Sequence, residues 1–121
     1  MVIAYWIVAG LLAVFFLYAG GLKVVRTPEQ LRPMMAWVDS MPLVLVRTIG
    51  VLEVLGAIGL ILPALTGVAP WLTLASAIGL LLVQIGGIVL HLRRGEANVI
   101  GLNIGLVVAL GLTCWLASVW L

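Results

Sequence analysis

The sequence predicts an all-α integral membrane protein, a four-helix bundle with a short amphipathic helix between its first and second long helices. Of its 121 residues, 65% are hydrophobic and only 8% are charged, whereas an ordinary soluble domain carries about 25% charged residues. Four apolar segments are each long enough to cross a bilayer as a helix, which takes about 20 residues. They lack the alternating polarity of membrane β-strands.

The four predicted spans cover most of a chain that is short enough for one domain, residues 1–121. They lie at about 3–22, 42–62, 70–90 and 98–120. The first span lacks the basic start of a signal peptide and is longer than a usual signal-peptide core, so we expect it to remain as a membrane helix. Pro63 and Pro70 bracket a short uncharged turn between the second and third spans.

The segment Thr27–Met41 is more polar and differs from the spans around it. Thr27 suits a helix N-cap, and Pro28 suits the first helical position. Further apolar side chains follow at helical spacing or close to it, at Leu31, Met34, Met35, Trp37 and Val38. We predict a short amphipathic helix that lies on the membrane surface or covers the polar end of the bundle.

The basic residues predict the orientation of the chain. All six lie in or beside the first and third loops: Lys23, Arg26, Arg32, Arg47, Arg93 and Arg94. The positive-inside rule places these loops in the cytoplasm and both termini outside, in a multi-pass protein of the bacterial plasma membrane. Four tryptophans fall near the predicted outer ends, as in an interfacial aromatic belt: Trp6, Trp71, Trp115 and Trp120. The lipid bilayer is the expected partner, and six basic residues confined to two short loops cannot form a nucleic-acid surface.

Glu53 is the one carboxylate inside a predicted span. Its helical face also carries Gly50, Gly56 and Ala57, small residues that let membrane helices approach closely. We therefore expect Glu53 to point into the bundle. An ionised side chain at that depth costs at least about 2.5–3.5 kcal/mol, so it must be neutral, paired or hydrated.

Other polar residues lie at similar depth in the remaining spans. The flexible stem of Lys23 can turn inward, and Gln84 and His91 share a helical face because they are seven residues apart. We predict a ligand pocket that opens toward the cytoplasmic leaflet, with Glu53 as the best candidate for a catalytic acid or base. Its predicted residues are Lys23, Arg47, Glu53, Gln84, His91 and Asn103. The alternative is interhelical hydrogen bonding that only holds the bundle together.

The third loop and the lone histidine and cysteine limit the chemistry. Arg93 and Arg94 act first as topology determinants and can also bind anionic lipid heads, while Glu96 can pair locally with either of them. His91 and Cys114 are the only residues of their kinds. A bis-histidine haem, an internal disulfide and a classical zinc site are therefore excluded. We predict no metal and no cofactor beyond a bound quinone or lipid.

Small residues in the fourth span raise the question of oligomers. Gly101 and Gly105 form a GxxxG motif. Such a motif favours close helix packing, either within the bundle or with a second membrane protein or a second copy of the chain.

Three stretches carry motifs: Ala19–Lys23 (AGGLK), Arg47–Pro63 (RTIGVLEVLGAIGLILP) and His91–Glu96 (HLRRGE). Together they resemble the DoxX-like family of small four-helix membrane proteins. The second stretch fits the family pattern R-x-I-G-x-x-E-x-x-G-x-x-G-L-x-L-P closely. The first departs slightly, since Leu22 precedes the lysine where an apolar residue often follows it, and Val24 fills that place. The motif positions are Lys23, Arg47, Glu53, His91, Arg94 and Glu96.

The resemblance implies a four-helix membrane fold and leaves function open between several classes. The family takes its name from a subunit associated with thiosulfate:quinone oxidation, and a distant animal relative is an assembly chaperone for ion-channel receptors. Our first hypothesis is a protein that binds a small hydrophobic ligand or quinone at Glu53, as a subunit of a membrane redox complex. The alternative is an assembly factor or accessory subunit for another membrane protein. A transporter ranks last because no inverted repeat with broken helices is visible, and enzymatic activity stays undecided.

Overall fold

The computed structural model describes residues 1–33, 41–97 and 100–121. Its long helices are α1 (Val2–Val25), α3 (Leu43–Thr66), α4 (Leu72–Arg93) and α5 (Gly101–Leu116), and the 3₁₀-helix η3 (Ala117–Trp120) extends the last of them. A single turn, α2 (Pro28–Leu31), follows α1. The described residues contain no strand. The predicted all-α fold with four long apolar helices is confirmed, and each of the four, α5 taken together with η3, is long and apolar enough to cross a membrane.

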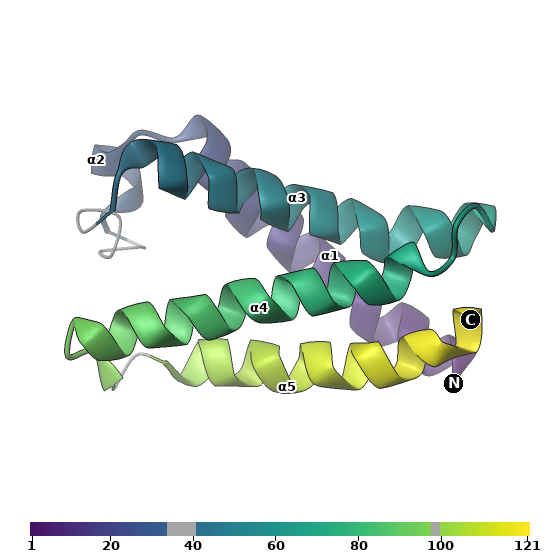
Figure 1. Cartoon of the computed structure of the whole chain (residues 1–121). Coiled ribbons are helices and arrows are strands. Elements are labelled where there is room, and N and C mark those ends of the chain that lie inside the picture. Colours follow the sequence, from purple (N-terminus) through teal and green to yellow (C-terminus); the bar gives the residue numbers. More distant parts are fainter. Residues whose placement is uncertain (34–40, 98–99) are drawn as a thin grey trace.

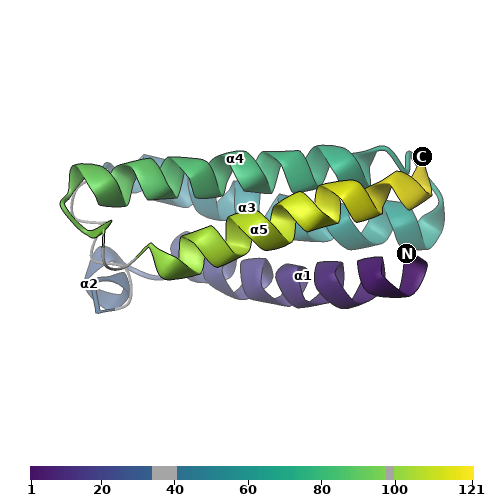
Figure 2. The same ribbon diagram turned by 90° about the horizontal axis from the view of Figure 1, so that it is seen from below.

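The helices form an antiparallel bundle in which α1 packs on α3, α3 on α4, and α4 on α5. Figure 1 shows α1 crossing the bundle obliquely. It lies beside α3 near α2 and approaches α5 at the opposite end. Both chain termini lie at that opposite end in Figures 1 and 2. We call it the terminal end, and we call the end with α2 and the α4–α5 connection the basic end.

The short α2 begins as the sequence predicts. The Thr27 hydroxyl accepts a hydrogen bond from the Gln30 amide at 3.3 Å, and the Gln30 side chain accepts one from the Thr27 amide at 2.9 Å. These reciprocal bonds form a capping box, which satisfies two amides that the helix start would otherwise leave unpaired. The predicted helix is wrong beyond Leu31 in the described residues, because Arg32 and Pro33 form a turn and Met41 lies in a bend. The remaining positions of that prediction, with Met34, Met35, Trp37 and Val38, lie outside the described residues, as does Asn98.

The second span is longer than predicted. We expect it to end at Leu62, but α3 continues through Pro63 to Thr66. A proline removes one helical hydrogen bond without forbidding a final turn near a helix end. Gly67 then ends the helix with a left-handed backbone, φ 73°, and its amide donates to the Pro63 carbonyl at 2.9 Å.

Two hydrophobic clusters divide the bundle along its length. The larger one fills the terminal half and joins α1, α3, α4 and α5, with Tyr5, Phe16, Leu60 and Leu110 among its fully buried side chains. Rings of Tyr5 and Trp6 contact Trp120 there at centroid distances of 5.4 and 5.7 Å. The smaller cluster, at the basic end, contains Leu22, Leu31 and Val46 with Met41 against it. It includes no residue of α5, so α5 is anchored to α1 mainly in the terminal half.

Two glycines set the close approach of α1 and α3. A Cβ atom built on Gly20 would lie 2.7 Å from the Gly50 carbonyl oxygen, and one built on Gly50 would lie 2.7 Å from the Gly20 oxygen. The two backbones are therefore so close that a side chain larger than the hydrogen atom of glycine does not fit between them at these positions. The small-residue face predicted around Glu53 is therefore a helix contact.

The GxxxG motif of the fourth span has a different place. A Cβ atom on Gly101 or Gly105 would meet nothing within 4 Å. Of the two alternatives predicted for this motif, packing within the bundle is therefore wrong. The motif lies on the outer face of α5.

Candidate functional site: a polar cavity at the basic end

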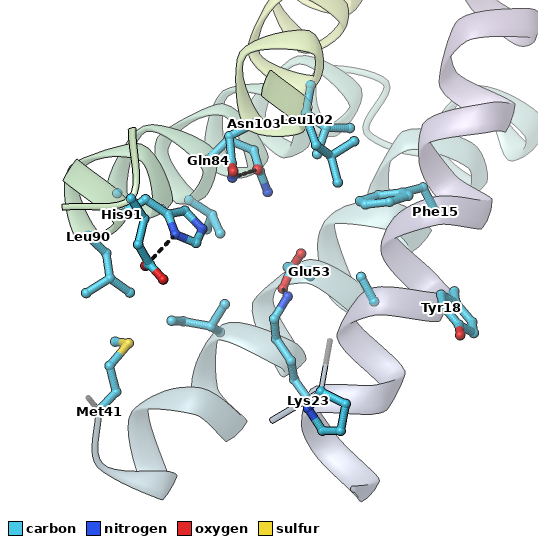
Figure 3. Close-up of a pocket in the computed structure, with 18 residues that line it drawn as sticks. Phe15, Tyr18, Lys23, Met41, Glu53, Gln84, Leu90, His91, Leu102 and Asn103 are labelled. Atoms are coloured by element: carbon cyan, nitrogen blue, oxygen red, sulfur yellow. Dashed lines mark hydrogen bonds and ion pairs between the residues drawn. The ribbon is translucent and has the colours of Figure 1, made fainter. Parts of the chain in front are cut away.

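A cavity of about 660 Å³ lies in the half of the bundle nearer the basic end. Its volume is within the range of about 300–1,000 Å³ that is typical of ligand pockets. The walls are mostly apolar and come from all four long helices, with Pro33 and Met41 beside them. Figure 3 shows the polar side chains gathered on two opposite walls. One wall carries Lys23 and Glu53, and the other carries Gln84, His91 and Asn103.

The first wall is a buried ion pair between α1 and α3. Lys23 Nζ donates to Glu53 Oε1, and the two residues are 7% and 1% exposed. The prediction that Glu53 points into the bundle is confirmed, and of the alternatives of a neutral, paired or hydrated carboxyl the structure shows a paired one. The pair forms because Gly20 and Gly50 bring the two helices together one turn away from it. A charged pair held in an apolar wall is a strong local dipole that faces the cavity.

Arg47 supports this wall without lining the cavity, although we expect it among the pocket residues. Its Nη1 donates to the carbonyl oxygens of Lys23 at 2.7 Å and Arg26 at 2.5 Å. The last carbonyls of α1 have no partners within their own helix, so the guanidinium satisfies them. Arg47 therefore holds the end of α1, and with it the backbone of Lys23, against α3.

The opposite wall contains an amide pair between α4 and α5. Asn103 Nδ2 donates to Gln84 Oε1 at 2.9 Å, and Gln84 is 6% exposed. Gly87 makes room for this contact, because a Cβ atom there would lie 3.2 Å from Asn103 Nδ2. The depth argument that placed Gln84 and Asn103 near Glu53 is supported by their common position on the cavity.

A tight turn after α4 brings together a third set of polar side chains, those of His91, Arg94 and Glu96. Gly95 has φ 73°, its amide donates to the Leu92 carbonyl at 3.1 Å, and the Glu96 amide donates to the His91 carbonyl at 2.8 Å. This pattern is a Schellman motif, which reverses the chain at a helix end. The reversal places Glu96 Oε1 2.7 Å from Arg94 Nε and 3.1 Å from His91 Nδ1. His91 and Glu96 line the cavity.

The charge of Glu96 should depend on Arg94. The hydrogen bond from Arg94, aided by that from His91, holds the pKa of the Glu96 carboxyl below its usual value. Since the folded-state pKa is the lower one, the contribution of this group to stability is present at neutral pH and is lost as the pH falls through that lowered pKa. We expect Arg94→Gln to raise the pKa of Glu96 in a carboxyl NMR titration in micelles. Arg93→Gln removes the same charge from the adjacent exposed residue and should leave it nearly unchanged.

The structure thus brings together five of the six predicted pocket residues and adds apolar ones that the sequence did not single out. Phe15, Tyr18 and Leu102 line the cavity, but in the sequence they look like any residue facing lipid. Arg93 is exposed and does not line it. In the described part of the chain, no three of the side chains His, Cys, Asp and Glu come close enough to hold a metal ion.

Four long apolar helices that together line a polar cavity define a small multi-pass integral membrane protein, which contacts the lipid bilayer. The DoxX-like family model matches residues 7–116, and the chain belongs to that family. The predicted resemblance is therefore confirmed. No curated protein and no solved structure matches the chain.

Proposed function

We propose that the protein binds a small hydrophobic molecule with oxygen acceptors, foremost a quinone, in the polar cavity. The observation that carries this proposal is the buried Lys23–Glu53 pair, which faces an apolar cavity large enough for such a molecule. Ligand sites combine apolar walls with a few convergent polar groups in this way. A charged group within a membrane span is costly, and in membrane proteins it commonly marks a functional site.

The hydrogen-bonding capacity of the walls favours an acceptor head group. The Gln84–Asn103 pair has four amide N–H groups and two carbonyls, and the bond between them uses one of each. Three N–H donors and one carbonyl are left, whichever way the two amides are oriented. Lys23, which donates to Glu53, and His91, whose Nδ1 lies 3.1 Å from Glu96 Oε1, also line the cavity. A carbonyl oxygen of a quinone would accept a hydrogen bond from the amides on one wall, and its ring would face the Lys23–Glu53 pair on the other.

A redox role would belong to a complex rather than to this chain alone. One histidine and one cysteine cannot supply the ligands of a bis-histidine haem or the four thiolates of an iron–sulfur cluster. The chain would therefore serve as the quinone-binding subunit, and another protein would supply the electrons. We place it in a bacterial plasma membrane with the basic end in the cytoplasm and both termini outside, because all six basic residues flank the connections at that end.

A second candidate is an assembly factor or accessory subunit of another membrane protein. The exposed face of α5 around Gly101 and Gly105 favours it, since glycines that face lipid let a second helix approach closely. A homo-oligomer would use the same face.

Native mass spectrometry from a gentle detergent tests these candidates. We would compare the wild type with Glu53→Gln, and use Glu29→Gln as the control because it makes the same change at an exposed carboxyl in α2. Titration with a decyl-tailed benzoquinone would accompany it. Binding that persists in Glu29→Gln and is lost in a folded Glu53→Gln supports the pocket. A protein partner that stays bound to the wild type and to both variants favours the assembly factor. If the wild type is folded but binds no quinone, the ligand proposal is wrong.

A further inference from the structure

The polar cavity opens sideways between α1 and α5. Tyr18 of α1 and Leu102 of α5 both line it, yet they are 59% and 63% exposed. Figure 3 shows Tyr18 at the outer side of α1, at the edge of the group of lining residues. Both positions lie in helices that are apolar enough to cross a membrane. Exposure at such positions is exposure to lipid.

The packing of the bundle explains this opening. In the terminal half, Phe16 of α1 and Leu110 of α5 are fully buried in one continuous core. Toward the basic end, the only other cluster in the described residues joins α1, α2 and α3 without α5. The oblique path of α1 in Figure 1 takes it away from α5 toward the basic end. The two helices therefore separate where the cavity lies, and its lining there consists of Phe15, Tyr18 and Ala19 on one side and Leu102 and Leu106 on the other.

The polar groups lie farther in than this opening. Glu53 is 1% exposed and Gln84 is 6% exposed, while the side chains at the opening are apolar or aromatic. Such a gradient suits a molecule with a polar head at the floor and an apolar tail at the opening. A water-soluble ligand would gain nothing from a route lined by Phe15 and Leu102.

We propose that the ligand is a single-tailed amphiphile that enters laterally from the bilayer between Tyr18 and Leu102 and leaves its tail in the lipid. Its head hydrogen-bonds to the Lys23–Glu53 pair and to the Gln84–Asn103 amides. This inference rests on the proposed function and adds the ligand class and the entry route. It also predicts that the length and bulk of the tail have little effect on affinity.

Two probes and two variants test this route on the full chain in lipid nanodiscs. The probes are a decyl-tailed benzoquinone and the same molecule with a triphenylphosphonium group at the end of its tail. Leu102→Trp narrows the opening, and Val108→Trp makes a matched change at a residue of α5 that is 66% exposed and does not line the cavity. We expect wild type and Val108→Trp to bind both probes alike, and Leu102→Trp to weaken both by about tenfold, the equivalent of about 1.4 kcal/mol of crowding.

Two kinds of result would overturn the inference, and they have different meanings. If the wild type binds the plain probe but rejects the capped one, the cavity encloses its ligand, so the lateral route is wrong while the pocket stands. The lateral route is also wrong if Leu102→Trp and Val108→Trp bind the probes equally well. If the wild type binds neither probe, the proposed quinone pocket fails, and the route fails with it.

Discussion

Replacing Lys23 with methionine should lower the free energy of unfolding by about 3–5 kcal/mol, because the Glu53 carboxylate would be left buried without its cation. Glu53 is 1% exposed, so bulk water does not replace the lost partner, and only the polar cavity gives access to the carboxylate. Glu53→Leu should cost a similar amount, because the buried Lys23 ammonium group would lose the carboxylate that it pairs with. Unfolding in mixed micelles, followed by helical circular dichroism, measures both losses.

The double variant Lys23→Met, Glu53→Leu should recover most of that stability, because replacing a whole buried pair by apolar side chains is often neutral or stabilising. Arg26→Met is the matched control: this exposed residue follows α1, and its loss should change stability by less than about 0.5 kcal/mol. A double variant as unstable as the sum of the single ones would show that the two residues act separately. A stable double variant that binds no quinone would assign the pair to binding.

The fold was predictable because the membrane imposes it. Four apolar runs and a turn bracketed by Pro63 and Pro70 leave few alternatives once every backbone group must be satisfied within the bilayer. The inward direction of Glu53 was equally predictable, since a carboxylate is costly to expose to lipid and the small residues on its face of α3 allow a close helix contact. The end of α3 was not predictable. Pro63 removes one helical hydrogen bond, but it does not prevent the last helical turn before Gly67.

The site was predictable in its polar residues and not in its shape. Depth along each helix placed Glu53, Gln84 and Asn103 together, and Lys23 joined them because its flexible stem can turn inward. The role of Arg47 was missed, because its contacts with the α1 carbonyls depend on how the first connection brings α1 beside α3. The side opening was missed for a related reason. It arises from the oblique path of α1, and a helix crossing angle leaves no mark on hydrophobic periodicity.

Gly20→Ala should destabilise the protein by about 1–3 kcal/mol, the usual cost of overpacking. The added methyl group would lie 2.7 Å from the Gly50 carbonyl oxygen, a backbone atom that cannot turn aside as a side chain can. The helices α1 and α3 would have to separate, which pulls Lys23 away from Glu53. Gly50→Ala should act alike, since its methyl group would meet the Gly20 oxygen and the Cβ atom of Lys23. Quinone affinity should fall together with stability in both variants.

The adjacent glycine supplies the control. A Cβ atom on Gly21 meets nothing within 4 Å, so Gly21→Ala should keep full binding and gain up to about 1 kcal/mol from the higher helix propensity of alanine. Neighbouring glycines in one helix would then have opposite effects, which no general property of glycine in membranes explains. Equal losses in Gly20→Ala and Gly21→Ala would instead mean that α1 needs flexibility at its end. Equal gains would mean that the α1–α3 contact yields easily and does not hold the ion pair in place.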